Sequence, residues 1–138
     1  MKLKQLLLSS LILVSASAWA EPTYRLFVTN EKSNSVSVID SRTNEVETTL
    51  DIGDRPRGIG LSPDQKILYV ALSEENAIAM VDVKTLKTIG KLNAGEDPET
   101  FDVHPNGNLY LSNEDDAKAT VINPETGKII EEIRVGLE

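Results

Sequence analysis

The side chains that could carry out chemistry are few, and His104 is the first of them. It is the only histidine in 138 residues, and the chain has no cysteine. No Gly-x-Ser-x-Gly sequence, glycine-rich phosphate loop or His-Glu-x-x-His metal motif accompanies it, so no nucleophile–base pair can be assigned. Because His104 precedes Pro105 at a predicted turn, we interpret it as a turn residue that bonds nearby backbone, rather than as a metal ligand, haem ligand or general base.

A second candidate is the acidic segment Asn113-Glu114-Asp115-Asp116. Its carboxylate and amide oxygens are the ligands that Ca²⁺ prefers. The spacing lacks the EF-hand pattern, and the whole chain is acidic, with a formal charge of −8. A solvated loop therefore explains the segment better than a calcium site, and we predict no metal site.

Arg55 and Arg57 are the best individual candidates for contacting a ligand. They form a cationic pair in acidic surroundings, and the planar fork of arginine suits carboxylate recognition. The alternative is ordinary solvated loop charge. Choosing between the two depends on the elements that position these side chains.

Those elements are the copies of an internal repeat. Leu26-Phe27-Val28, Leu68-Tyr69-Val70 and Leu109-Tyr110-Leu111 are spaced 42 and then 41 residues apart. The same spacing relates Gly53 to Gly95 and Pro56 to Pro98. Agreement at so many positions indicates tandem copies of one structural unit. We place the units at about 24–66, 67–108 and 109–138.

Each copy can be read as four short strands joined by turns. In the second copy the predicted strands are 57–61, 67–71, 77–82 and 88–94, each with alternating or compact apolar residues. Turn chemistry separates them, as at Ser62-Pro63-Asp64-Gln65. Four antiparallel strands in about forty residues are typical of a β-propeller blade. We therefore predict an all-β chain of about three blades, the last one truncated, with apolar rows between neighbouring sheets.

The amino-acid sequence of the repeat also resembles a known family, over residues 21–138. Tyr24-Arg25-Leu26-Phe27-Val28-Thr29-Asn30 and Asn34-Ser35-Val36-Ser37-Val38-Ile39-Asp40 resemble the YVTN-type propeller repeat. Asp97-Pro98-Glu99 and His104-Pro105-Asn106-Gly107 further resemble periplasmic propellers associated with quinoprotein (PQQ-dependent) alcohol catabolism. These are related to the haem d1-binding propeller of nitrite reductase. The resemblance implies an association with PQQ or haem d1, whereas the residues themselves give evidence of no cofactor.

In a propeller, the loops entering each innermost strand and the loops between second and third strands share one face around the central channel. Here those loops are 53–57, 95–99, 29–34, 72–76 and 112–117. Loops on a rigid scaffold are where binding is usually placed. The predicted ligand-binding residues are those with charged or amide side chains on these loops: Arg55, Arg57, Glu75, Asp97, Glu99, Asn113 and Asp115. We predict no catalytic residue.

The N-terminal segment has the pattern of a cleavable signal peptide over residues 1–20. A basic start with Lys2 and Lys4 precedes the apolar run 6–15, which is short for a bilayer span, and Ala18-Trp19-Ala20 is a cleavage site. We expect cleavage after Ala20, a periplasmic or secreted location, and no membrane span afterwards. Absent cysteines exclude disulfides, cysteine zinc sites, iron–sulfur clusters and covalent haem. The acidity argues against nucleic acid as a partner.

Propellers usually close with four to eight blades, so we expect residues 21–138 to be the N-terminal portion of a larger propeller whose remaining blades are its partners. The leading hypothesis for function is an exported, non-enzymatic binding or scaffold propeller, which docks a periplasmic redox protein or holds a small ligand. One alternative is a cofactor-binding (haem d1-like) propeller subunit of a redox system. Another is a lactonase-type hydrolase.

Overall fold

The computed structural model describes residues 24–115 and 117–136. Within these residues the chain forms eleven strands and two short 3₁₀ turns, η1 (Glu31–Ser33) and η2 (Ser73–Glu75). The strands are β1 (Arg25–Asn30), β2 (Ser35–Asp40), β3 (Glu45–Asp51), β4 (Pro56–Leu61), β5 (Ile67–Leu72), β6 (Ala77–Asp82), β7 (Lys87–Asn93), β8 (Pro98–Val103), β9 (Leu109–Asn113), β10 (Lys118–Asn123) and β11 (Lys128–Arg134).

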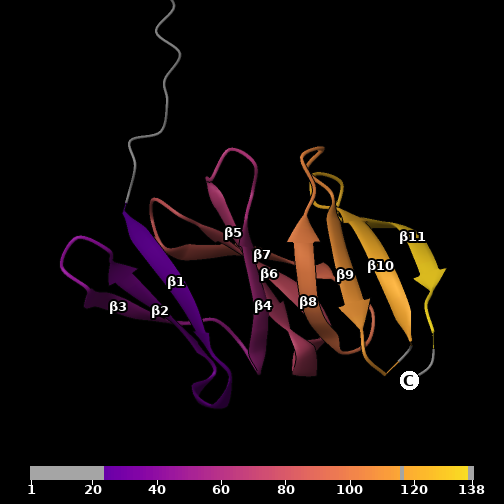
Figure 1. The fold of residues 1–138 in the computed structure, drawn as a ribbon, viewed down its shortest axis with the longest axis horizontal. Coiled ribbons are helices and arrows are strands. Elements are labelled where there is room, and N and C mark those ends of the chain that lie inside the picture. The colour runs from indigo at the N-terminus through magenta and orange to yellow at the C-terminus, as the bar shows by residue number, and fades with distance from the viewer. Residues whose placement is uncertain (1–23, 116, 137–138) are drawn as a thin grey trace, which may run out of the picture.

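The strands form three antiparallel sheets that lie side by side (Figure 1). The first sheet is β1-β2-β3, the second β4-β5-β6-β7 and the third β8-β9-β10-β11, each a simple meander. Strand β4 packs against both β1 and β8, whereas the outer strands β7 and β11 barely meet. The sheets therefore converge on their first strands. This confirms the predicted all-β, blade-like architecture.

Local sequence explains the repeated connection that joins β1 to β2 and β5 to β6. A 3₁₀ turn follows β1 and β5, and in each case it ends on an asparagine with left-handed backbone, Asn34 (φ 54°) and Asn76 (φ 55°). Asparagine tolerates this conformation better than most residues because its short polar side chain can bond locally. The chain then turns back directly into β2 and β6.

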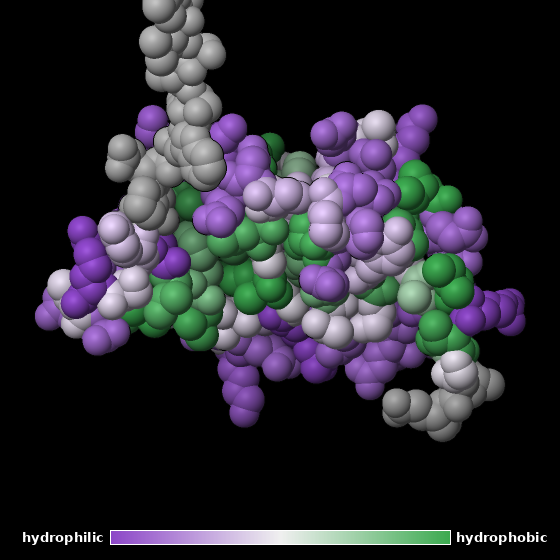
Figure 2. All heavy atoms as spheres, turned by 45° about the horizontal axis from the view of Figure 1, so that its top comes forward, coloured by the Kyte–Doolittle hydropathy of each residue, from purple (hydrophilic) through white to green (hydrophobic). Residues whose placement is uncertain are grey.

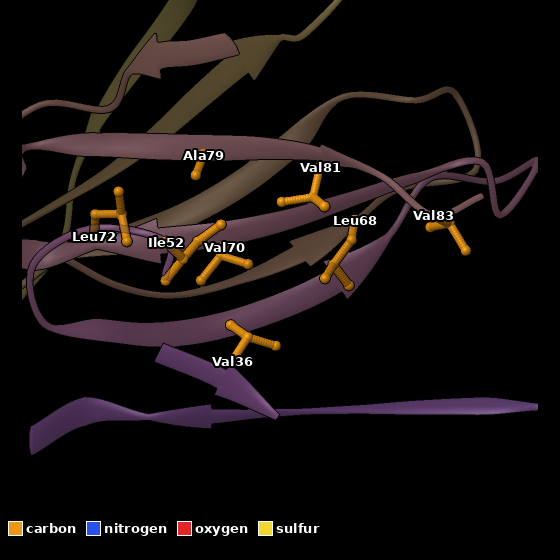
Figure 3. Close-up of a cluster of buried hydrophobic side chains, with 8 residues drawn as sticks. All are labelled: Val36, Ile52, Leu68, Val70, Leu72, Ala79, Val81 and Val83. Atoms are coloured by element: carbon orange, nitrogen blue, oxygen red, sulfur yellow. The ribbon is translucent and has the colours of Figure 1, made fainter. Parts of the chain in front are cut away.

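The core lies between the sheets. One cluster fills the seam between the first and second sheets: Val36, Ile52, Leu68, Val70, Leu72, Ala79, Val81 and Val83. In Figure 3 the side chain of Val36, on β2, faces Val70 and Leu68 on β5. A second cluster, built around Ile78, Leu92, Leu109 and Ile122, joins the second and third sheets. The apolar rows predicted from the repeat are thus buried by stacking of neighbouring sheets.

Strands β5 and β6 are the most buried, and the last strand of each sheet is mostly exposed. Leu26 and Val28 alternate with Phe27, which packs on the first core cluster, so they lie on the side of the first sheet that no described sheet covers. Figure 2 shows the resulting pattern, with hydrophobic side chains across the middle and hydrophilic ones over both edges.

The sequence repeat and the sheets are phased differently. The copies of the repeat begin at the strands β1, β5 and β9, whereas the four-stranded sheets begin one strand earlier, at Pro56 and Pro98. The predicted signal peptide, residues 1–20, lies outside the described residues. Among the residues that are described, no helix is long and apolar enough to cross a bilayer.

Candidate functional site

The strand ends form two opposite faces. The loop face consists of residues 31–34, 52–55, 73–76, 94–97, 114–115 and 117, and it forms the lower edge in Figure 1. The turn face consists of residues 41–44, 62–66, 83–86, 104–108 and 124–127. In Figure 1 the turn 41–44, between β2 and β3, lies at the left, and the other turns lie along the upper edge. Because the strands of each sheet are antiparallel, the loops that enter β4 and β8 share the loop face with the connections β1–β2, β5–β6 and β9–β10. All the predicted loops therefore come together.

Arg55 lies at the centre of the loop face and contacts carboxylates from all three sheets. Its Nε is 3.0 Å from Oε1 of Glu31, which follows β1. Its Nη1 is 3.5 Å from Oε1 of Glu74, in the second sheet, and 3.9 Å from Oδ1 of Asp97, which leads into the third. We call Arg55, Glu31, Glu74 and Asp97 the Arg55 cluster. The hydrogen bond with Arg55 lowers the pKa of Glu31, and the same bond raises the pKa of Arg55.

The backbone of the segment that carries Arg55 is held by side chains. Arg55 has left-handed backbone (φ 53°), and its N–H donates to Oδ1 of Asn34 at 3.0 Å. One residue earlier, the N–H of Asp54 donates to Oε1 of Glu75 at 2.8 Å. Glu75 also accepts from Nζ of Lys91 at 2.5 Å, and these two bonds, that from Lys91 first, lower its pKa. Glu75 is therefore occupied in holding the linker between two sheets.

Arg57 and Glu99 form a second, less exposed ion pair, with side chains 26% and 18% exposed. Arg57 lies on β4 and Glu99 on β8, the two innermost strands of neighbouring sheets. The strands approach closely because Gly58 has no side chain: a Cβ there would lie 2.9 Å from the backbone of both Glu99 and Thr100. The carbonyl of Arg57 accepts a hydrogen bond from Oγ1 of Thr29 at 3.0 Å, which ties β4 to the first sheet as well.

Three carboxylates, of Asp97, Glu99 and Glu114, lie with oxygen atoms within 4.8 Å of one another. Only Glu114 belongs to the acidic segment 113–116. Arg57 already pairs with Glu99, and Arg55 lies near Asp97. Two of these carboxylates, Asp97 and Glu99, therefore face guanidinium groups of the same chain.

The side chain of Asn113 is buried and is not exposed on the loop face. It is only 2% exposed, and its Nδ2 donates to the carbonyl oxygens of Ala94 (2.9 Å) and Glu96 (2.7 Å). Its Oδ1 accepts from Oγ1 of Thr120 at 2.7 Å. The side chain is fully used in joining β9 to the linker before β8. Asp115, in contrast, is exposed on the loop face.

A shallow hollow of about 380 Å³ opens beside Arg55. Every residue that lines it is polar or charged: Glu31, Lys32, Asn34, Asp54, Arg55 and Glu74. Of the predicted residues, the structure brings Arg55, Arg57, Asp97 and Glu99 together around the inner strands and places Asn113 in the interior. Sequence reasoning missed Glu31, Asn34, Asp54 and Glu74. The αL-prone asparagines at matching repeat positions, 34 and 76, were the available signal.

His104 lies on the turn face, remote from the Arg55 cluster. The backbone N–H of His104 donates to the carbonyl of Asn108 at 2.9 Å, and the ring Nδ1 accepts from the backbone N–H of Asn106 at 3.2 Å. Its ring also contacts that of Tyr110, with centroids 5.7 Å apart. The interpretation of His104 as a turn residue that bonds nearby backbone is confirmed.

Comparison with known proteins shows one family. Residues 17–134 match the family described as "Lactonase, 7-bladed beta-propeller". No curated protein matches the chain.

Solved structures share the fold at low identity. Kuenenia stuttgartiensis hydrazine synthase has a TM-score of 0.72 at 23% identity, over 78% of this chain and 32% of that one. Dihydro-heme d1 dehydrogenase NirN in complex with DHE has 0.66 at 19%, over 83% and 25%. A putative 6-phosphogluconolactonase from Bacteroides fragilis has 0.69 at 22%, over 79% and 35%. This chain thus spans between 25% and 35% of the length of these three chains.

Proposed function

Because the chain belongs to the lactonase family of seven-bladed β-propellers, we propose that it is part of a ligand-binding propeller. Its loop face takes a small, neutral, polyhydroxylated molecule of the sugar-lactone class, beside the Arg55 cluster. The observation that carries this proposal is the meeting of Arg55 with carboxylates from three sheets at the edge of a wholly polar hollow.

The chemistry of the hollow suits hydroxyl groups. Its volume of about 380 Å³ lies at the lower end of the range for small-molecule sites. Carboxylates such as Glu31 and Glu74 accept hydrogen bonds from ligand hydroxyls, while Arg55 donates in a fixed fork to a ring or carbonyl oxygen. The contacts of Arg55 to Glu74 and Asp97 are long, at 3.5 and 3.9 Å, so donors remain for a ligand.

The charge balance favours a neutral ligand over an anionic one. Arg55 and Arg57 were predicted to recognise a carboxylate, yet each already faces carboxylates of this chain. An anion would add to the negative field of Glu31, Asp54 and Glu74, and like charges at short range repel. A polyol avoids that cost and still uses the same donors and acceptors.

Binding can be tested on the full chain by isothermal titration with D-gluconolactam, a stable analogue of gluconolactone. We expect saturable binding that Arg55→Ala abolishes and Arg55→Lys weakens, because lysine keeps the charge but loses the fork. Lys66→Ala, which removes a cation from the turn face, is the matched control and should leave binding unchanged. Equal loss in both alanine variants, or tighter binding of sodium gluconate than of the lactam, would contradict the proposal.

Lactone hydrolysis is the second candidate, favoured by the family match and by the half-buried Arg57–Glu99 pair. In this scheme Glu99 accepts the proton of the attacking water, and Arg57 stabilises the oxyanion that forms at the lactone carbonyl. The test is acid release from D-glucono-1,5-lactone above the spontaneous rate. Loss of that excess in Glu99→Gln, with lactam binding retained, would separate hydrolysis from binding.

The remaining functional hypotheses rest on a sequence pattern and on resemblance. Export is inferred from the signal-peptide pattern of residues 1–20. A link to quinoprotein (PQQ-dependent) oxidation through a periplasmic redox partner follows from the resemblance to the YVTN-type subgroup. The haem d1 alternative gains support from the likeness to NirN only at the level of fold, since identity is 19%. Incubation with haem d1 followed by gel filtration tests it: a visible absorption band that elutes with the protein at one cofactor per chain would favour a redox role, and elution of the cofactor apart from the protein would contradict it.

A further inference from the structure

A second hollow, of about 400 Å³, lies on the turn face, at the seam between the second and third sheets. One wall is the turn 62–64 with the start of β5, and the other is formed by the turns 105–108 and 123–125 of the third sheet. Both walls belong to the described chain, so the hollow is complete within it. It lies at the opposite edge of the sheets from the Arg55 cluster, and the proposed function does not use it.

The walls are rigid and partly apolar. Pro63, Pro105 and Pro124, one from each contributing turn, line the hollow together with Ile67 and Tyr69. Proline has a fixed φ, so these turns are preorganised and lose little freedom when a ligand binds. The lining of the hollow is thus partly polar and partly apolar.

The charged groups on the walls are all acidic. Asp64 lies on one side and Glu125 on the other, and the described residues that line the hollow include no lysine, arginine or histidine. Asp64 is partly balanced from outside by Lys66, whose Nζ is 3.2 Å from its Oδ2. No ion pair of Glu125 occurs among the described residues.

The field of both carboxylates reaches into the hollow. The pKa of Tyr69 is raised, first by burial of the phenol and then by the charges of Asp64 and Glu125. A negative potential between apolar walls favours a cation that carries apolar substituents, because such a cation gains both charge attraction and contact with aromatic and aliphatic groups.

We propose that the turn-face hollow binds a small organic ammonium ion, with its charge between Glu125 and Asp64 and its apolar substituents against Tyr69 and the prolines.

The test is a pair of NMR titrations of the ¹⁵N-labelled full chain. Choline is the probe, and 3,3-dimethylbutan-1-ol, which has the same shape without the charge, is its control. We expect choline to cause saturable shifts at the amides of Lys66, Gly107 and Asn108, and the alcohol to cause none of comparable size.

Matched variants locate the charge effect. Glu125→Gln should weaken choline binding by about two- to fivefold, in keeping with loss of one exposed charge contact. Glu131→Gln removes the same charge from exposed strand β11 and should leave the affinity unchanged. Absence of saturable shifts at tens of millimolar choline would overturn the proposal. Equal binding of the alcohol, or equal weakening in both variants, would do so too.

Discussion

Oδ1 of Asn34 accepts a hydrogen bond from the N–H of Arg55 at 3.0 Å, across the seam between the first two sheets. The next copy repeats the arrangement, since Oδ1 of Asn76 accepts from the N–H of Asp97 at 3.0 Å. In both cases an asparagine at the end of a 3₁₀ turn holds the left-handed residue that leads into the following sheet. We call this hydrogen bond, from the backbone N–H of the left-handed residue to the asparagine side chain, the asparagine latch. The two residues that it holds, Arg55 and Asp97, belong to the Arg55 cluster, so the latch also positions the candidate site.

Replacing Asn34 with glycine should lower the free energy of unfolding by about 1 kcal/mol, because the N–H of Arg55 loses its acceptor and Oδ1 of Asp54 loses the donor Nδ2 of Asn34. Glycine keeps the left-handed backbone of residue 34, and its added unfolded-state entropy is measured separately by the control below. Asn34→Ala should cost more, since alanine also resists φ 54°. Urea unfolding of the full chain, followed by circular dichroism, measures both.

The matched control is Asn44→Gly. Asn44 also has left-handed backbone (φ 60°), but no hydrogen bond of its side chain occurs within the described residues. Equal destabilisation by Asn34→Gly and Asn44→Gly would show that the latch contributes nothing.

Position 117 of the third copy matches Asn34 and Asn76 but holds alanine, with φ 48°. A Cβ in this region of backbone space is strained, and asparagine or glycine relieves the strain. We therefore expect Ala117→Gly and Ala117→Asn each to raise the free energy of unfolding by about 0.5–1 kcal/mol. An unchanged or lower melting temperature in both variants would count against left-handed backbone at this position.

The close approach of β4 and β8 predicts a strong effect at Gly58. A Cβ there would lie 2.9 Å from the carbonyl oxygen of Glu99 and from Cα of Thr100, which are backbone atoms and cannot rotate away. Gly58→Ala should cost about 1–3 kcal/mol of stability, as overpacking does in cores. It should also separate Arg57 from Glu99. Gly136→Ala is the control and should be neutral, because no atom of the described residues lies within 4 Å of the added Cβ.

Strand positions were predictable from the sequence, whereas the pairing of charges was not. Alternating apolar residues and proline turns placed the second sheet to within one or two residues, because those signals act locally. The Arg55 cluster joins Arg55 to residues 19 to 42 positions away, and their meeting depends on how the sheets stack. Asn113 shows the same limit: an acidic neighbourhood suggests solvent, yet its register on β9 matches that of Leu72 on β5 and places it inside.

Arg42 should control the titration of Asp40. Its Nε and its backbone N–H both donate to Oδ1 of Asp40, at 3.0 and 2.9 Å, and these bonds lower the pKa of Asp40 to about 2. Because the pKa is lower in the folded state, the interaction stabilises the protein above the unfolded pKa of about 3.9, and this stability is lost as the pH falls toward 2. We expect Arg42→Ala to return the pKa of Asp40 toward its ordinary value in a ¹³C carboxylate titration. An unchanged midpoint would show that the pair is not formed.

Asn113→Ala should be the most damaging of these substitutions. Three partners lose their bonds at once: the carbonyl oxygens of Ala94 and Glu96, and the hydroxyl of Thr120. Because the site is buried, water cannot replace the lost bonds without rearrangement, and we expect a loss of about 2–4 kcal/mol in urea unfolding. Asn113→Leu, which introduces the residue found at the matching position 72, should not rescue stability, since leucine leaves the same polar groups unpaired. Ser112→Ala is the control on the exposed side of the same strand and should cost little. Full stability of Asn113→Leu would mean that position 113 acts only by filling space, and its hydrogen bonds would then have no role in joining the third sheet to the linker before it.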